Sequence, residues 1–113
     1  MSARPRVLLV EDEPSVLEII AALLNDEYSV STAATVADAI RQLREAEFTV
    51  VLLDCSLPNG TATEIIAACE TRNVPIVLTS RDLQQRDTAG GRPYLAKPFT
   101  IDALLETLRA VLT

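Results

Sequence analysis

The sequence predicts a single α/β domain over residues 1–113, in which a doubly wound parallel sheet lies between two layers of helices. Short runs rich in Val, Leu and Ile alternate along the chain with longer stretches that have helical spacing. The clearest runs are apolar at successive positions, which is typical of strands that helices cover on both sides. Such an alternation builds a three-layer sandwich, and a chain of this length is sufficient for one domain.

Five segments are predicted strands. The strongest are Val7–Val10, Val50–Leu53 and Ile76–Leu78, and two weaker ones are Tyr28–Thr32 and Tyr94–Ala96. Their lengths of three to five residues are normal for strands in globular proteins. We therefore expect a five-stranded sheet.

Apolar residues three and four positions apart predict helices between these strands. The pattern is clearest from Val16 to Leu24 and from Ile101 to Leu112, and weaker from Val36 to Leu43 and from Ala62 to Cys69. The segment 81–92 has little apolar periodicity. A fourth helix there is therefore expected to be short or irregular.

Residues that favour helix starts precede these patterns. Pro14 is placed where the first residue of a helix tolerates proline. Thr35, Thr61 and Thr100 each stand before an apolar helical pattern, with an acidic residue in the turn that follows. We expect these threonines to cap their helices.

Composition excludes several classes of function. The chain has no histidine, which excludes His-ligated metal sites, Ser-His-Asp triads and Cys-His dyads. Its net charge is −6 and its arginines are scattered, so we expect no direct contact with nucleic acid. Cys55 and Cys69 are expected in or near the core rather than as a redox pair. The chain start does not resemble a signal peptide, and no apolar run is long enough to span a membrane. We therefore expect a cytoplasmic protein without a membrane segment.

Polar side chains follow the predicted strands where a doubly wound sheet binds its ligands, at the carboxyl ends. They are Glu11 and Asp12 after the first strand, Asp54 after the third, Thr79 at the end of the fourth, and Lys97 after the fifth. Clustered carboxylates raise one another's pKa unless a cation neutralises them, and all-oxygen ligands suit Mg²⁺. A carboxylate beside Mg²⁺, facing an ammonium and a hydroxyl, is equipped to accept a phosphoryl group.

Four motifs in this order, VLLVEDEP, DCSLP, PIVLTS and YLAKPF, resemble the receiver domains of bacterial two-component response regulators. The resemblance covers nearly the whole chain. It implies a flavodoxin-like fold with the strand order 2-1-3-4-5. It also implies a cytoplasmic phosphorelay protein that acts as a switch rather than as a conventional enzyme, with self-catalysed phosphorylation and dephosphorylation.

The same resemblance implies a role for each site residue. Asp54 would be the phosphoacceptor. Glu11 and Asp12 would hold Mg²⁺ together with Asp54 and the backbone carbonyl of Ser56. Thr79 and Lys97 would contact the phosphoryl oxygens.

Further implications concern the switch and the partners. Thr79 and Tyr94 would form a coupled switch pair, and the peptide bond between Lys97 and Pro98 would be cis. The phosphoryl donor would be a sensor histidine kinase or a histidine phosphotransfer protein, and the output would be an unidentified protein.

Two alternative functions that also involve phosphate are excluded by particular residues. A haloacid-dehalogenase-like phosphatase needs a second Asp two residues after the nucleophile, where this chain has Ser56. A flavodoxin-like electron carrier needs a hydroxyl-rich and Gly-rich loop after the first strand, where this chain has Glu-Asp-Glu-Pro.

A third alternative stays open: a receiver-like interaction module that does not depend on phosphorylation. The segment after DCSLPNG reaches its helix sooner than in the family, and the segment between Thr79 and Tyr94 is a few residues short. These departures affect the family's usual output face, so we expect a monomer.

Overall fold

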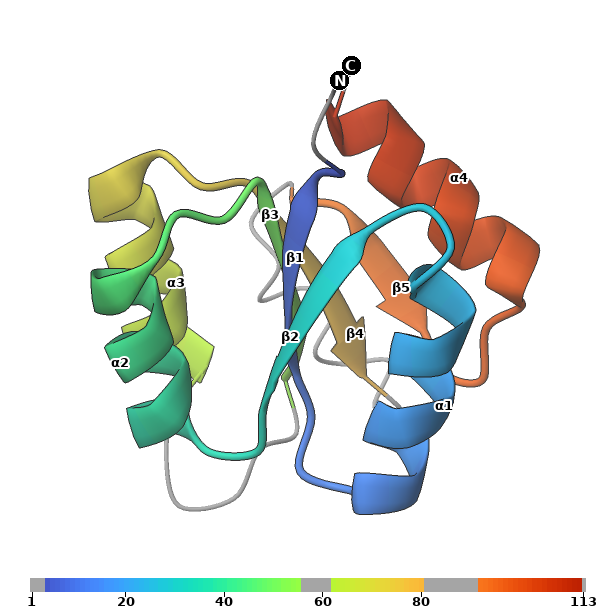
Figure 1. Ribbon diagram of the computed structural model, residues 1–113, viewed down its shortest axis with the longest axis horizontal. Helices are drawn as coiled ribbons and strands as arrows, with labels where there is room; N and C mark the ends of the chain where they lie inside the picture. The colour runs from blue at the N-terminus through green and yellow to red at the C-terminus, as the bar shows by residue number, and fades with distance from the viewer. Residues whose placement is uncertain (1–3, 56–61, 81–91, 113) are drawn as a thin grey trace.

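A computed structural model describes residues 4–55, 62–80 and 92–112. The strands are β1 (Arg6–Val10), β2 (Ser29–Ala33), β3 (Val50–Asp54), β4 (Ile76–Ser80) and β5 (Tyr94–Ala96). The helices are α1 (Pro14–Leu24), α2 (Val36–Glu45), α3 (Ala62–Arg72) and α4 (Ile101–Leu112). The strands form one parallel sheet in the order β2-β1-β3-β4-β5 (Figure 1). The predicted doubly wound fold is therefore confirmed.

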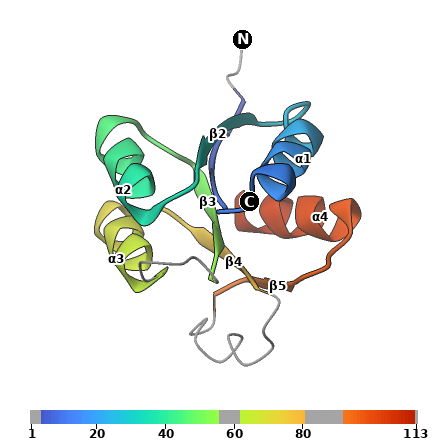
Figure 2. The same cartoon turned by 90° about the horizontal axis from the view of Figure 1, so that it is seen from below.

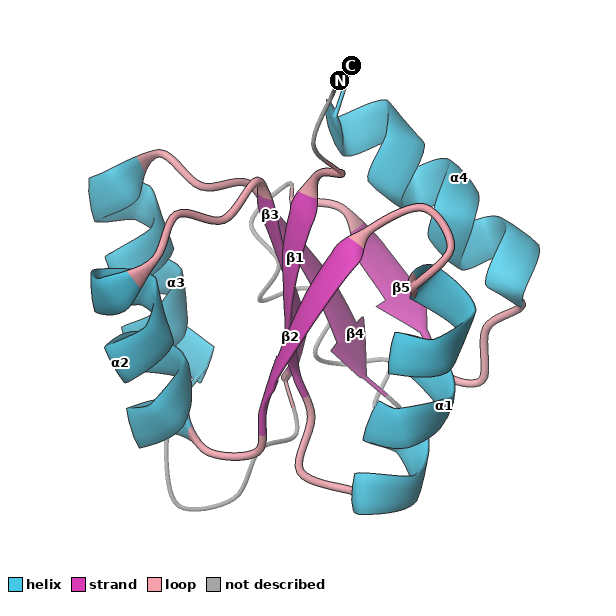
Figure 3. Cartoon of the chain, viewed as in Figure 1, coloured by secondary structure: helices cyan, strands magenta, loops and turns pink. Residues whose placement is uncertain are grey.

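Helices cover both faces of the sheet. Viewed along the strands, α2 and α3 lie on one side and α1 and α4 on the other (Figure 2). The secondary-structure colouring shows the strands as a thin central layer between them (Figure 3). All five residues of β3 and all five of β4 are buried, which agrees with their apolar sequences.

The alternation of side chains along β1 divides the core into two clusters. Val7 and Leu9 pack in the cluster under α1 and α4, together with Leu24 and Leu108. Leu8 and Val10 point the other way and pack with α2 and α3. Burial of this apolar surface contributes about 25 cal/mol per Å², so each layer of helices is held to the sheet by its own cluster.

The helix starts agree with the sequence where the structure describes them. Pro14 is the first residue of α1. The Thr35 hydroxyl accepts a hydrogen bond from the backbone N–H of Asp38 at 3.1 Å, and the Thr100 hydroxyl accepts one from the N–H of Ala103 at 3.0 Å. The expected cap at Thr61 lies outside the described residues.

One expectation, the start of the second strand, differs from the structure, and another, the fourth helix, falls outside the described residues. The second strand begins at Ser29 rather than Tyr28, because the Tyr28 N–H still donates to the Leu24 carbonyl at the end of α1. The irregular helix expected within 81–92 lies outside the described residues, except for Arg92. Across the described ranges, no helix is both long and apolar enough to cross a membrane.

Candidate functional site

The register of the sheet places two of the predicted carboxylates at the same level. Val10 of β1 pairs with Leu53 of β3, so Glu11 and Asp54 come next on neighbouring strands. The Glu11 N–H donates to the Ala33 carbonyl at 3.0 Å, which extends the β1–β2 ladder one residue beyond the strand. Glu11 is thus held by backbone pairing although it follows the last residue of β1.

Three carboxylates gather at this edge. Each of Glu11, Asp12 and Asp54 offers an oxygen, and these oxygens lie within 4.8 Å of one another. Glu11 and Asp54 are 2% and 4% exposed, while Asp12 is partly exposed. Hard, negatively charged oxygen ligands with one side open to water fit Mg²⁺, which keeps several waters when it binds to proteins. The donor set therefore suits the predicted metal.

Lys97 reaches into the acidic cluster from the end of β5. Its Nζ donates to Glu11 Oε2 at 2.6 Å and to Asp54 Oδ2 at 3.3 Å. Its backbone N–H donates to the Ser80 carbonyl at 2.9 Å, which fixes the start of the side chain beside β4. The shorter contact is to Glu11, so Lys97 neutralises a proposed metal ligand as well as the proposed phosphoacceptor.

Burial and charge shift the pKa of both partners. Burial raises the pKa of Glu11; the hydrogen bond from Lys97 lowers it, and Asp54 raises it further, so the net direction is upward. Burial lowers the pKa of Lys97, but the hydrogen bond to Glu11 and the two negative charges outweigh this, so its pKa is raised. Lys97 therefore carries its positive charge at neutral pH.

Thr79 lies beside the acidic cluster on the neighbouring strand. It pairs with Asp54 in the β3–β4 register and is buried. The Cys55 N–H donates to the Thr79 carbonyl at 2.8 Å, so this pairing continues past Asp54. The hydroxyl-bearing residue thus comes from the strand next to the carboxylate, as the strand-end argument predicts.

The remaining predictions concern Tyr94, the peptide bond before Pro98, and Ser56. Tyr94 pairs with Leu78 in the sheet, and its hydroxyl lies 3.4 Å from the Ser80 carbonyl oxygen, a long hydrogen bond. The peptide bond between Lys97 and Pro98 is cis. Ser56, predicted to supply a backbone carbonyl, lies outside the described residues.

Ser80 is a site neighbour that the sequence analysis did not single out. It is fully buried, and its carbonyl accepts from both the Lys97 N–H and the Tyr94 hydroxyl. The sequence feature that could have indicated Ser80 is a small polar residue at the end of an apolar strand.

An apolar groove of about 540 Å³ borders the site on the α1 and α4 side. Lys97 and Phe99 line it together with α1 residues that include Ile19 and Leu23. Ile19 is 60% exposed and Leu23 48% exposed, although both belong to the periodic apolar pattern that predicted the helix. Part of that pattern therefore faces out of the core.

Comparison with known proteins gives consistent matches. The sequence model of the response regulator receiver domain matches residues 7–109. The chain is 33% identical over 114 residues to the probable transcriptional regulatory protein TcrX of Mycobacterium tuberculosis, covering 94% of this chain and 49% of that protein. It is 30% identical to Protein PilH of Pseudomonas aeruginosa, covering 95% and 97% respectively. The chain thus spans about half the length of TcrX and of several other transcriptional regulators that it matches.

Solved structures agree with the fold. A CheY-like response regulator receiver domain protein from Methanospirillum hungatei superposes with a TM-score of 0.88 at 25% identity, covering 97% of this chain and 94% of that one. The receiver domain of sensor histidine kinase PA1611 from Pseudomonas aeruginosa superposes with a TM-score of 0.86 at 29% identity, covering 97% and 98%. That second structure holds a magnesium ion in its active-site cleft.

Proposed function

The chain belongs to the response regulator receiver domain family of two-component systems, and on this premise we propose that Asp54 accepts a phosphoryl group from a histidine of another protein. Receiver domains act as phosphoacceptor switches rather than as conventional enzymes. The observation that carries the proposal is the contact of Lys97 Nζ with both Glu11 and Asp54 at the carboxyl edge of the sheet.

Transfer would exchange one bond to phosphorus for another. An Asp54 carboxylate oxygen forms the new O–P bond while the N–P bond to the donor imidazole breaks, and that imidazole takes up a proton. Residues 1–113 contain no histidine, so the donor histidine lies outside them, on a sensor histidine kinase or a histidine phosphotransfer protein. Hydrolysis of the resulting acyl phosphate, with water as the nucleophile, resets the switch without a further catalyst.

Metal ligation is part of the proposal. Glu11, Asp12 and Asp54 would hold Mg²⁺, with Ser56 contributing its backbone carbonyl. The cation would neutralise negative charge on the transferred group. Lys97, the residue after β5, would supply a second positive charge, and the buried Thr79 would supply a hydrogen-bond donor from β4, the strand next to β3.

The switch would follow from a change of partner by Lys97. Without phosphate its ammonium is bound to Glu11 and Asp54. A phosphoryl group on Asp54 would offer it closer, more negative oxygens, and Thr79 would turn toward the same group. Tyr94 would report this movement at the surface, because its hydroxyl contacts the residue after Thr79. A local electrostatic change of this kind can bias a two-state element.

The cellular setting completes the proposal. Residues 1–113 would act as one receiver domain that passes the signal through a protein surface rather than by contacting nucleic acid. A cytoplasmic location is supported by Cys55 and Cys69, which are free thiols in the structure.

Intact-mass spectrometry after incubation with acetyl phosphate and Mg²⁺ tests the function. The wild-type protein should gain one phosphoryl group, and Asp54→Asn should gain none. Asp26→Asn removes an exposed carboxylate of the same type and should label normally. Equal labelling of Asp54→Asn would refute the acceptor assignment, and an unlabelled wild type would favour an interaction module that works without phosphorylation.

A further inference from the structure

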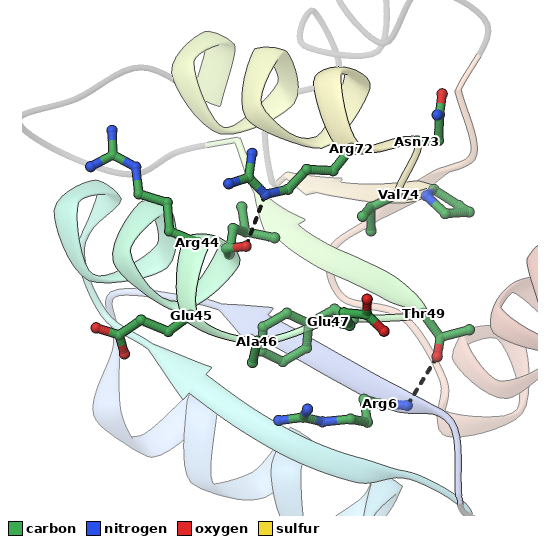
Figure 4. A pocket seen from close by; sticks show the side chains of 12 residues that line it. Arg6, Arg44, Glu45, Ala46, Glu47, Thr49, Arg72, Asn73 and Val74 are labelled. Carbon is green, nitrogen blue, oxygen red and sulfur yellow. Dashed lines mark hydrogen bonds between the residues drawn. The ribbon is translucent and has the colours of Figure 1, made fainter.

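A second cavity, of about 740 Å³, lies at the end of the sheet opposite to Asp54. It is formed by the start of β1, by the connection from α2 to β3, and by the connection from α3 to β4 (Figure 4). The amino ends of the strands meet here, whereas the acidic cluster lies at their carboxyl ends. The two sites are therefore separated by the length of the sheet.

Three arginines line this cavity: Arg6, Arg44 and Arg72. The chain has only ten basic residues and a net charge of −6, so this is a concentration of positive charge in an acidic protein. In Figure 4, Arg44 and Arg72 extend from the ends of α2 and α3, and Arg6 lies on the other side of the segment that carries Ala46.

Two of these guanidinium groups are oriented by contacts that leave hydrogen-bond donors available. Arg72 Nε donates to the Leu43 carbonyl at 2.9 Å, and its two terminal nitrogens make no further hydrogen bond within the described residues. The Arg6 guanidinium carbon lies 5.1 Å from the centre of the Phe48 ring, a cation–π contact. Arg44 is exposed and makes no hydrogen bond or ion pair in the described part of the chain.

Helix-end electrostatics explain only part of this arrangement. Arg44 and Arg72 stand in the last turns of α2 and α3, where positive charge is favourable, and the bond to Leu43 satisfies a carbonyl at a helix end. These roles require one N–H of Arg72. They do not require Arg6, which comes from a strand, or the remaining guanidinium donors.

The carboxylates in the cavity wall do not cancel the positive charge. Glu45 lines the cavity, but its carboxylate accepts a hydrogen bond from Arg41 at 2.9 Å, and Arg41 is not among the lining residues. Glu47 is the other acidic residue in the wall. The cavity wall thus contains three guanidinium groups and two carboxylates, and one of these carboxylates, that of Glu45, is already paired with Arg41.

We propose that this cavity binds a small organic phosphate of about the size of a nucleotide. Guanidinium groups match phosphate oxygens with paired N–H donors, and Arg44 and Arg72 are placed to hold the phosphate. The volume exceeds the needs of a lone phosphate ion and lies in the range of small-molecule sites. Ala46, Val74 and Pro75 supply apolar wall for the organic part.

NMR titration of ¹⁵N-labelled protein with ADP in metal-free buffer tests the proposal. Chemical-shift changes should centre on residues 44–49 and 72–75. Arg44→Gln should weaken binding about tenfold, the factor expected for loss of one charge-assisted contact of about 1.4 kcal/mol. Glu47→Gln should strengthen binding, because it removes a repelling charge. Arg109→Gln, which removes an exposed arginine from α4, should leave the affinity unchanged.

Four outcomes would overturn the proposal. One is the absence of shifts near Arg44 and Arg72 at millimolar ADP, and another is a set of shifts centred on Lys97. The third is equal weakening by Arg44→Gln and Arg109→Gln, which would indicate diffuse attraction to net charge. Adenosine provides a further check, because binding as tight as that of ADP would exclude recognition of phosphate. The variants lie far from Asp54, so the test does not depend on its phosphorylation.

Discussion

Replacing Lys97 by methionine removes one positive charge and keeps a side chain of similar length. In the wild type this ammonium bonds to Glu11 at 2.6 Å and to Asp54 at 3.3 Å, and its side chain is 11% exposed. Breaking a buried ion pair costs about 3–5 kcal/mol, because the remaining charge stays buried without a partner. Lys97 keeps some contact with water, so we expect a loss of about 3 kcal/mol in metal-free stability.

Mg²⁺ should reverse much of this loss. The ammonium and the metal compete for Glu11, and a hydrogen bond between charged groups contributes about 1.5–3 kcal/mol. Without that competition, Lys97→Met should bind Mg²⁺ about tenfold more tightly or better, since about 1.4 kcal/mol corresponds to a factor of ten. A ligand at one hundred times its Kd stabilises the folded state by about 2.7 kcal/mol, so the variant should gain more from the metal than the wild type does.

Urea unfolding followed by circular dichroism, with EDTA and then with Mg²⁺, measures both effects. Lys97→Arg keeps the charge and should lose less stability in EDTA than Lys97→Met. Arg109→Met, which breaks an exposed pair with Glu27, should change stability little. The reasoning fails if Lys97→Met is as stable as the wild type in EDTA, or if Mg²⁺ stabilises both proteins equally.

Two further predictions concern Asp12 and Cys69. Asp12→Ala should abolish phosphorylation by acetyl phosphate and weaken Mg²⁺ binding while the fold stays intact, because Asp12 is the partly exposed member of the cluster; a fully active variant would refute its metal role. Burial raises the pKa of the Cys69 thiol to about 11 from an ordinary value of 9.0, so the folded state retains a proton that the unfolded state loses between these pH values. Stability should therefore fall by about 2 kcal/mol as pH rises from 9 to 11. Urea unfolding across this range should show a shallower fall for Cys69→Ala, and an identical slope would contradict the shift.

The strand-end argument predicted that the side chains of the site lie together, because it needs only the order of elements and the rule for parallel sheets. Asp54 follows a run that is buried throughout, and Glu11 and Thr79 then fall on the neighbouring strands by register. The contact of Lys97 with Glu11 was not predicted, because it depends on which of two nearby carboxylates the ammonium approaches more closely. The spacing of residues in the sequence does not indicate which carboxylate this is.

The cavity lined by three arginines could not be predicted from the sequence, for a different reason. Arg6, Arg44 and Arg72 are scattered along the chain, and each has an ordinary explanation as a solvated charge or a helix-end residue. They lie together because β1 starts where α2 and α3 end. All three stand at or next to an end of a regular element, and the hydrophobic patterns that predict helices and strands do not predict which element ends lie close together.

The ion pair between Lys97 and Glu11 joins residues 86 positions apart, which has a consequence for the order of synthesis. Glu11 leaves the ribosome 86 residues before Lys97 does. A nascent chain therefore holds its acidic cluster without its cation partner, and non-local contacts of this kind form late in folding. Under the proposed function, competence to receive the phosphoryl group would be acquired only after β5 has emerged, so a ribosome-bound fragment that stops before β5 should be unable to compete with finished molecules for the donor.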